Sequence, residues 1–166
     1  MKNIKFHFLI IFLICPLFAK DIYFTRSGII SFFSSAPLED IEAVNKQVTC
    51  VLDMGTGEVA FRVPIPGFTF KNGLMQEHFN ENYMESEKYP KAAFKGNIDA
   101  WDSINLSIEP QQVTLTGMIS KTDGQVRGSA KFNIIVADYE IKIPKILRDN
   151  IAKIVDVTVK LNLKKK

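Results

Sequence analysis

Alternation of apolar and polar residues over most of the chain is the feature that most limits its fold. A period of two makes one face of a β-strand apolar and the other polar. The alternating segments are 47–53, 58–65, 91–101, 111–120, 126–136 and 155–163. A further strand is expected within 22–35, where residues 29–33 are apolar on both faces. About seven or eight such strands predict an antiparallel sheet with one buried face.

Short turns between the strands support the antiparallel arrangement. Residues 54–57 read Met-Gly-Thr-Gly, which is typical of a tight turn between paired strands. Asp123 and Gly124 supply the positive φ angles of a second hairpin. Pro64 and Pro66 end the ladder of the segment 58–65, because proline donates no hydrogen bond to a sheet.

One stretch departs from the alternation and predicts the single helix of the chain. Residues between 74 and 83 recur at the i, i+3 or i+4 spacing that defines one helix face. They are Leu74, Met75, His78, Phe79, Asn82 and Tyr83. Asn72 is a suitable N-cap, and Pro90 stops the helix from continuing. We expect this helix to pack over the sheet with Met75, Phe79 and Tyr83 toward the interior. His78 would then lie at its polar edge.

The apolar column of the strands mixes large and very small side chains. Its large members are Phe61, Phe94, Leu115 and Phe132, and its small members are Ala92, Gly96, Gly117, Gly128 and Ala130. Small inward residues let a sheet curl, and a closed barrel of about eight strands can hold one small ligand. A two-sheet sandwich is the alternative architecture. Glycines that only relieve crowding at bends would leave the interior filled.

The N-terminus predicts export. Lys2 and Lys5 precede an apolar run over residues 6–18, and Ala19 follows it. A basic region, an apolar region and a small residue in this order are typical of a secretory signal peptide. We expect residues 1–19 to be removed and residues 20–166 to form one domain, periplasmic or secreted in a bacterium. An uncleaved anchor and lipidation at Cys15 are the alternatives.

Cleavage would change both the charge and the cysteine content. The formal net charge of +3 would fall to +1 with the loss of Lys2 and Lys5. A nearly neutral protein argues against nucleic acid as the main partner. Cys50 would remain as the single cysteine, so no intramolecular disulfide would form. Its alternating segment predicts a small buried apolar residue.

Few residues offer the chemistry of an enzyme. His78 is the single histidine after residue 19, and Glu77 is its neighbour. Zinc sites need three or four ligands, and neither HExxH nor CxxC spacing occurs. The Walker, GxGxxG and G-x-S-x-G motifs do not occur either. We therefore expect no catalytic residue, no metal and no dedicated cofactor.

Several motifs, in this order, resemble those of YceI-like proteins. The most extensive covers residues 74–86 and is followed by Lys88, Tyr89, Pro90, Phe94, Lys95 and Gly96. The others are residues 32–37 with Ile41, Ala43 and Asn45; Asp53 with Gly55, Thr56 and Gly57; and Phe61, Val63, Pro64 and Ile65. The resemblance covers nearly all of the chain after residue 19. It implies a lipocalin-like antiparallel β-barrel with one helix, usually exported, that holds a long isoprenoid chain in an apolar tunnel.

The primary hypothesis is an exported, non-enzymatic protein that holds an apolar lipid for transport, storage or sequestration. The lipid would be an isoprenoid or quinone-like chain, and the protein would meet a membrane only transiently to exchange it. The expected ligand-binding residues are Phe61, Val63, Met75, His78, Phe79, Tyr83, Phe94, Leu115 and Phe132. One alternative is an interaction module with a filled barrel, whose partner surface includes Trp101, Met118 and Ile135. The other is an enzyme that acts on a bound lipid through Glu77 and His78.

Overall fold

The computed structural model describes residues 21–35, 39–100, 103–108, 111–139 and 153–166, without the side chains of 99–100, 103–108, 111–116 and 139. Its elements are β1 (Ile22–Ser34), β2 (Ile41–Asp53), β3 (Glu58–Pro64), η1 (Ile65–Gly67), β4 (Phe68–Phe70), α1 (Gly73–His78), η2 (Phe79–Tyr83), β5 (Lys91–Ala100), β6 (Ser103–Ile108), β7 (Gln111–Thr122), β8 (Gln125–Ile135), η3 (Val136–Tyr139) and β9 (Ile154–Lys165). The predicted targeting segment with Cys15, and Trp101, lie outside the described residues.

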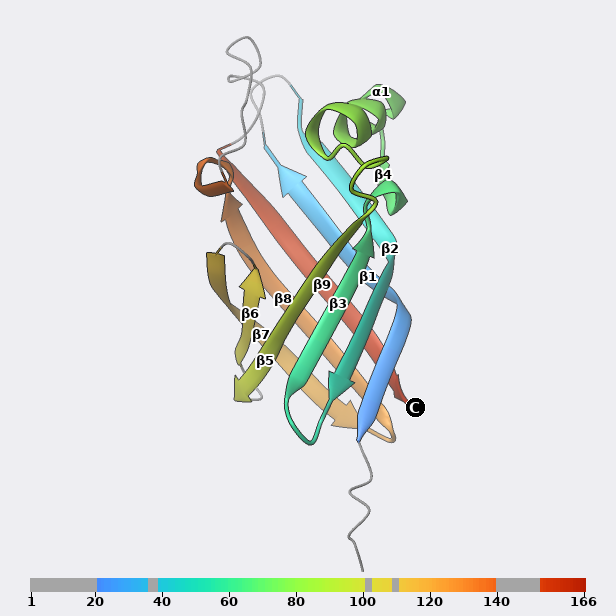
Figure 1. Cartoon of the computed structure of the whole chain (residues 1–166), viewed down its shortest axis with the longest axis vertical. Helices are drawn as coiled ribbons and strands as arrows, with labels where there is room; N and C mark the ends of the chain where they lie inside the picture. Colours follow the sequence, from blue (N-terminus) through green and yellow to red (C-terminus); the bar gives the residue numbers. More distant parts are fainter. Residues whose placement is uncertain (1–20, 36–38, 101–102, 109–110, 140–152) are drawn as a thin grey trace, which may run out of the picture.

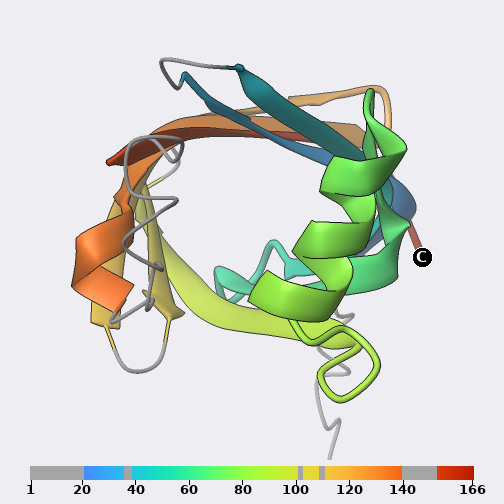
Figure 2. The same cartoon turned by 90° about the horizontal axis from the view of Figure 1, so that it is seen from above.

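Eight of the strands close into an antiparallel barrel. The sheet order is β1-β9-β8-β7-β6-β5-β3-β2, and β1 also pairs with β2, which completes the ring. Figure 2 shows this ring from above, with the helix beside its opening. In Figure 1 the β2–β3 and β7–β8 hairpins lie at the opposite end from α1, so we name the two ends the hairpin end and the helix end. The predicted barrel with one helix is confirmed, and the closed ring excludes the sandwich.

The strand register places the predicted apolar column inside the barrel. In β8, Val126, Gly128 and Ala130 are buried, whereas Arg127 and Lys131 are exposed. The β7–β8 hairpin has the predicted turn, with φ angles of 47° at Asp123 and 76° at Gly124. The apolar residues of each alternating segment therefore form the inner wall of the barrel, and the polar residues form the outer wall.

Two strands, β2 and β6, differ from the prediction. β2 begins at Ile41 rather than at residue 47, and its pairing with β1 shifts register between Asn45 and Val48. Lys46 and Gln47 are both exposed in this bulge, so they break the alternation without ending the strand. β6 was not predicted as a strand at all; it pairs with both β5 and β7.

β4 takes over from β3 as the partner of β2. The second half of β2 pairs with β3, but the pairing ends before Pro64, because proline lacks the donor that a ladder needs. The short 3₁₀ turn η1 then leads to β4, which pairs with Ala43, Val44 and Asn45 of β2. The chain thus reaches the helix end already attached to the barrel.

The helix begins where the sequence predicts. The side-chain oxygen of Asn72 accepts a hydrogen bond of 2.9 Å from the backbone N–H of Leu74, as an N-cap should. After α1 the chain continues as a π-helical segment, η2, in which the Met84 N–H donates to the Phe79 carbonyl. Of the helices in the described part of the chain, none is long and apolar enough to cross a membrane.

The packing face of the helix differs from the predicted one. Met75 and Phe79 are half-buried as expected, but Tyr83 is 41% exposed and His78 is exposed. The side chain of Gln76 lies on the packed side instead, since it accepts a hydrogen bond of 3.2 Å from the Phe70 N–H. A π-helical turn is wider than an α-helical one, so Tyr83 no longer stacks over Phe79.

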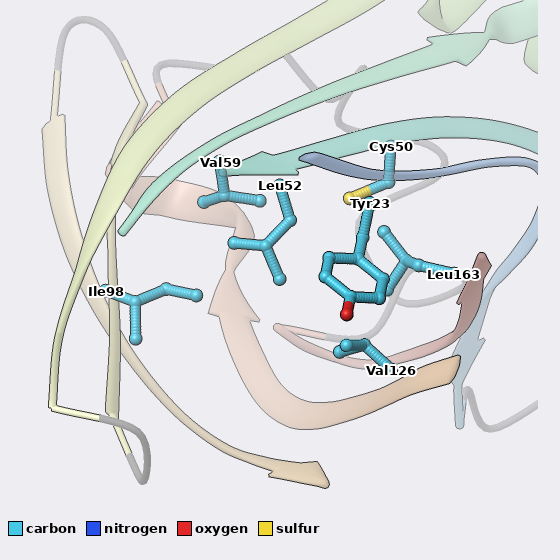
Figure 3. Packing of buried hydrophobic residues seen from close by; sticks show 7 residues of the cluster. All are labelled: Tyr23, Cys50, Leu52, Val59, Ile98, Val126 and Leu163. Atoms are coloured by element: carbon cyan, nitrogen blue, oxygen red, sulfur yellow. The ribbon is translucent and has the colours of Figure 1, made fainter. Parts of the chain in front are cut away.

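The hairpin end holds a tightly buried core. Figure 3 shows its members, which are Tyr23, Cys50, Leu52, Val59, Ile98, Val126 and Leu163. Asp21 lies at this end and forms ion pairs with Lys121 at 3.2 Å and Lys165 at 2.8 Å. The Lys121 amine also lies 5.2 Å from the centre of the Tyr23 ring. Apolar side chains and a small charged cluster together close this end of the barrel.

Candidate functional site

The inner wall of the barrel is buried unequally along its length. At the hairpin end, Leu52 and Leu163 each keep only 1% of their surface exposed. Nearer the helix end, Phe61, Phe94 and Phe132 share the inward register but are only half-buried. Protein interiors normally pack to high density, so inward side chains that keep exposed surface face unfilled space. Unfilled space therefore lies along the middle of the barrel, between the buried core at the hairpin end and the buried Ala43, Val48 and Val63 nearer the helix.

A small apolar cavity of about 40 Å³ lies next to the buried core. Half-buried Phe61, Ile119 and Leu161 line it together with the small residues Gly128 and Ala130. Cavities with apolar walls stay dry rather than hold ordered water. The cavity suits one small hydrocarbon group better than a water molecule.

A cluster of phenylalanines joins the helix to the barrel. Five pairs among Phe32, Phe68, Phe70 and Phe79 have ring centres 5.0 to 5.8 Å apart. Such tilted and edge-on contacts add to the free energy that burial provides. The same apolar cluster extends to Val63, Phe61 and Phe94 on the barrel wall. A continuous apolar surface therefore runs from the helix into the barrel.

The structure brings together only part of the predicted ligand-binding set. Phe61, Val63, Phe79 and Phe94 belong to one apolar cluster. Phe132 faces inward on β8, and Met75 is half-buried on α1. His78 and Tyr83 are both exposed. The π-helical turn accounts for Tyr83, whereas His78 lies at the end of α1 before that turn. The side chain of Leu115 lies outside the described residues.

Other residues of this interior were not predicted. Phe32 lies in the cluster around Phe79, but its strand is apolar on both faces, so its direction was ambiguous. Phe68 was not among the expected ligand-binding residues. Leu161 was predicted to face inward, but not to line a cavity. A signal for Phe68 was present in its own alternation with the exposed Thr69.

The described residues offer an apolar surface rather than reactive groups. Burial raises the pKa of the Cys50 thiol to about 12, so the nucleophilic thiolate is strongly disfavoured. Glu77 and His78 are both exposed on α1, away from the phenylalanine cluster. Within the described ranges, no group of three or more His, Cys, Asp or Glu side chains is placed to hold a metal ion. What this interior can do chemically is to shelter hydrocarbon from water.

Comparison with known sequences gives one family. Residues 28–164 match the family model described as a YceI-like domain. No curated protein matches the chain.

Solved structures share the fold. A polyisoprenoid binding domain from Saccharophagus degradans, implicated in plant cell wall breakdown, is 13% identical with a TM-score of 0.72, and the match covers 89% of this chain and 100% of that chain. BcnA from Burkholderia cenocepacia is 12% identical with a TM-score of 0.68, over 83% and 96% of the two chains. A YceI protein from Campylobacter jejuni is 13% identical with a TM-score of 0.62, over 80% and 89%. At these identities the similarity establishes the fold.

Proposed function

Because the chain belongs to the family of YceI-like domains, we propose that it is an exported binding protein that holds an apolar lipid inside its barrel. The observation that carries this proposal is the apolar surface left uncovered in the interior beyond the buried core of the hairpin end. Leu52 and Leu163 fill the hairpin end, whereas Phe61, Phe94 and Phe132 leave apolar surface uncovered nearer the helix. When a hydrocarbon chain covers apolar surface inside the barrel, the complex is stabilised by roughly 25 cal/mol per Å² of surface removed from water.

The ligand class that fits is a long isoprenoid or quinone-like chain. The described side chains of the two apolar clusters carry no charge, so the wall they form favours hydrocarbon over a charged ligand. A solved domain with the same fold is described as polyisoprenoid binding. We propose that the protein carries or stores such a lipid and meets a membrane only while it exchanges it.

Mass spectrometry of the bound lipid tests the proposal. The exported protein is purified from several hosts and extracted with organic solvent, and an isoprenoid lipid in about equimolar amount is expected. Phe132→Asn places an amide on the inner wall of β8 and should lower the lipid content. Ile135→Asn makes the same kind of change on the outer wall, where Ile135 is exposed, and should leave it unchanged. Preparations that contain no lipid from any host would refute the proposal.

An interaction module is the second candidate, and the outer wall gives it some support. Met118 is 75% exposed, and the exposed Ile135 and Ile154 face each other across the β8–β9 ladder. Single exposed apolar residues are common, so this observation is weaker than the uncovered inner wall. Cross-linking that captures no partner through these residues would remove this candidate.

A further inference from the structure

The inner wall ends at a floor rather than continuing through the barrel. Tyr23 is 1% exposed, and Figure 3 shows its ring among Leu52, Val126 and Leu163. Beyond this ring lies Asp21 with its ion pairs to Lys121 and Lys165. An apolar chain cannot pass this point, because it would have to displace buried side chains and separate ion pairs without replacing their contacts. A lipid can therefore occupy the barrel only from the helix end.

The 40 Å³ cavity lies against this floor. Leu52, Val126 and Leu163 of the floor line it, and so do the half-buried Phe61, Ile119 and Leu161. Every one of these side chains is apolar. The cavity is thus the deepest space that the tip of a hydrocarbon chain could reach.

Leu161 is held in place between two glycines of neighbouring strands. A Cβ atom on Gly28 of β1 would lie 2.9 Å from Leu161 Cδ2, and a Cβ atom on Gly128 of β8 would lie 3.5 Å from Leu161 Cδ1. The first distance is a clash, whereas the second is an ordinary van der Waals contact. Leu161 fills the space that the missing side chains leave, and Gly128 keeps the remaining cavity free.

We propose that this cavity is the terminal subsite for the bound chain, and that Leu161 and Gly128 set the longest chain that the barrel accepts. The inference rests on the proposed function, because it assigns the position of the lipid's apolar tip. The polar head group then lies at the helix end. A chain that is too long would leave hydrocarbon in water at the opening, and one that is too short would leave the cavity empty.

Competition between chain lengths tests this inference. Delipidated full-length mature protein is mixed with equimolar quinones that differ only in the number of isoprene units, and the bound fraction is extracted and quantified. Leu161→Ala enlarges the subsite, so the preferred chain should lengthen by about one isoprene unit. Gly128→Ala adds a methyl group in the cavity at a tolerated distance, so the preferred chain should shorten or the longest quinones should lose occupancy. Ile135→Ala serves as the control, because Ile135 is exposed on the outer wall of the same strand and its truncation should leave the preferred length unchanged.

The outcomes separate this inference from the proposed function. If the wild-type protein binds quinones and both subsite variants keep its length preference, the terminal subsite is wrong and lipid binding stands. If Leu161→Ala does not fold, the opposite shift in Gly128→Ala still decides the question. If the wild-type protein binds none of the quinones and carries no lipid from any host, both proposals are refuted.

Discussion

The side-chain amide of Asn45 donates a hydrogen bond of 2.7 Å to the carbonyl oxygen of Pro64. The other end of the same side chain accepts a hydrogen bond of 2.8 Å from the backbone N–H of Gln47. Asn45 is completely buried, and a Cβ atom on Gly67 would lie only 2.9 Å from its amide nitrogen. One asparagine thus joins the bulge of β2 to the point where β3 stops and η1 begins.

Asn45→Ala should therefore destabilise the protein by about 2–4 kcal/mol, because it leaves the Pro64 carbonyl and the Gln47 N–H without their partner. Asn45→Asp keeps the acceptor but places a buried carboxylate against the Pro64 carbonyl oxygen, so at neutral pH it should destabilise the protein at least as much as Asn45→Ala. Urea denaturation measures all three proteins. Gln47→Ala is the control, since it removes an exposed side chain and keeps the backbone N–H. Equal midpoints for Asn45→Ala and Gln47→Ala would show that the buried amide contributes nothing.

Phe79 anchors the helix, and its removal should separate the helix from the barrel. Its ring centre lies 5.0 Å from that of Phe70, 5.4 Å from that of Phe68 and 5.7 Å from that of Phe32. Phe79→Ala should cost about 2–3 kcal/mol, somewhat less than for a fully buried ring, because Phe79 is half-buried. Phe79→Asp should prevent stable folding, because it places a charge among the rings.

Two variants of the same helix control for this experiment. Tyr83→Ala and His78→Ala change exposed side chains, so each should alter stability by less than about 0.5 kcal/mol. Thermal unfolding followed by circular dichroism measures the set. A Phe79→Ala protein as stable as Tyr83→Ala would place the helix outside the core.

The sequence predicted the walls of the barrel better than its ends. Alternation is a local property, so it identified the inward side of Phe61, Phe94 and Phe132 and the buried Cys50. The helix face could not be predicted in the same way, because the i, i+4 pattern assumes α-helical spacing and the π-helical turn over Phe79–Tyr83 changes it. The role of Asn45 also depends on residues distant in sequence, since Pro64 meets it only after β3 has paired.

The buried thiol of Cys50 should make stability fall at alkaline pH. Its pKa is about 12 in the folded protein and 9.0 for an unperturbed thiol, so only the unfolded chain loses the proton between these values. The folded state is thus disfavoured progressively as pH rises through this window, by up to about 1.4 kcal/mol per pH unit. Lysines and tyrosines titrate in the same range, so the measured quantity is the difference between the wild-type protein and Cys50→Ala. Parallel stability curves for the two proteins would contradict the prediction.

Removal of the proposed lipid should loosen the helix end and leave the residues beyond the Tyr23 ring unchanged. A ligand that covers Phe61, Phe94 and Phe132 stabilises only the folded state, by about 2.7 kcal/mol when its free concentration is a hundred times its dissociation constant. Delipidated protein should therefore melt at a lower temperature, and added prenylated quinone should restore the melting temperature of the loaded protein.

Hydrogen exchange locates the effect: amides of β4 and α1 should exchange faster without lipid, because the phenylalanine cluster loses part of its packing. The amide of Met54, which donates to the Asp21 carbonyl beyond the buried Tyr23 ring, serves as the internal control, since the proposed ligand does not reach it. Equal changes in protection at both ends would mean that the lipid stabilises the whole barrel without a preferred end, and the assignment of the open end to the ligand would fail.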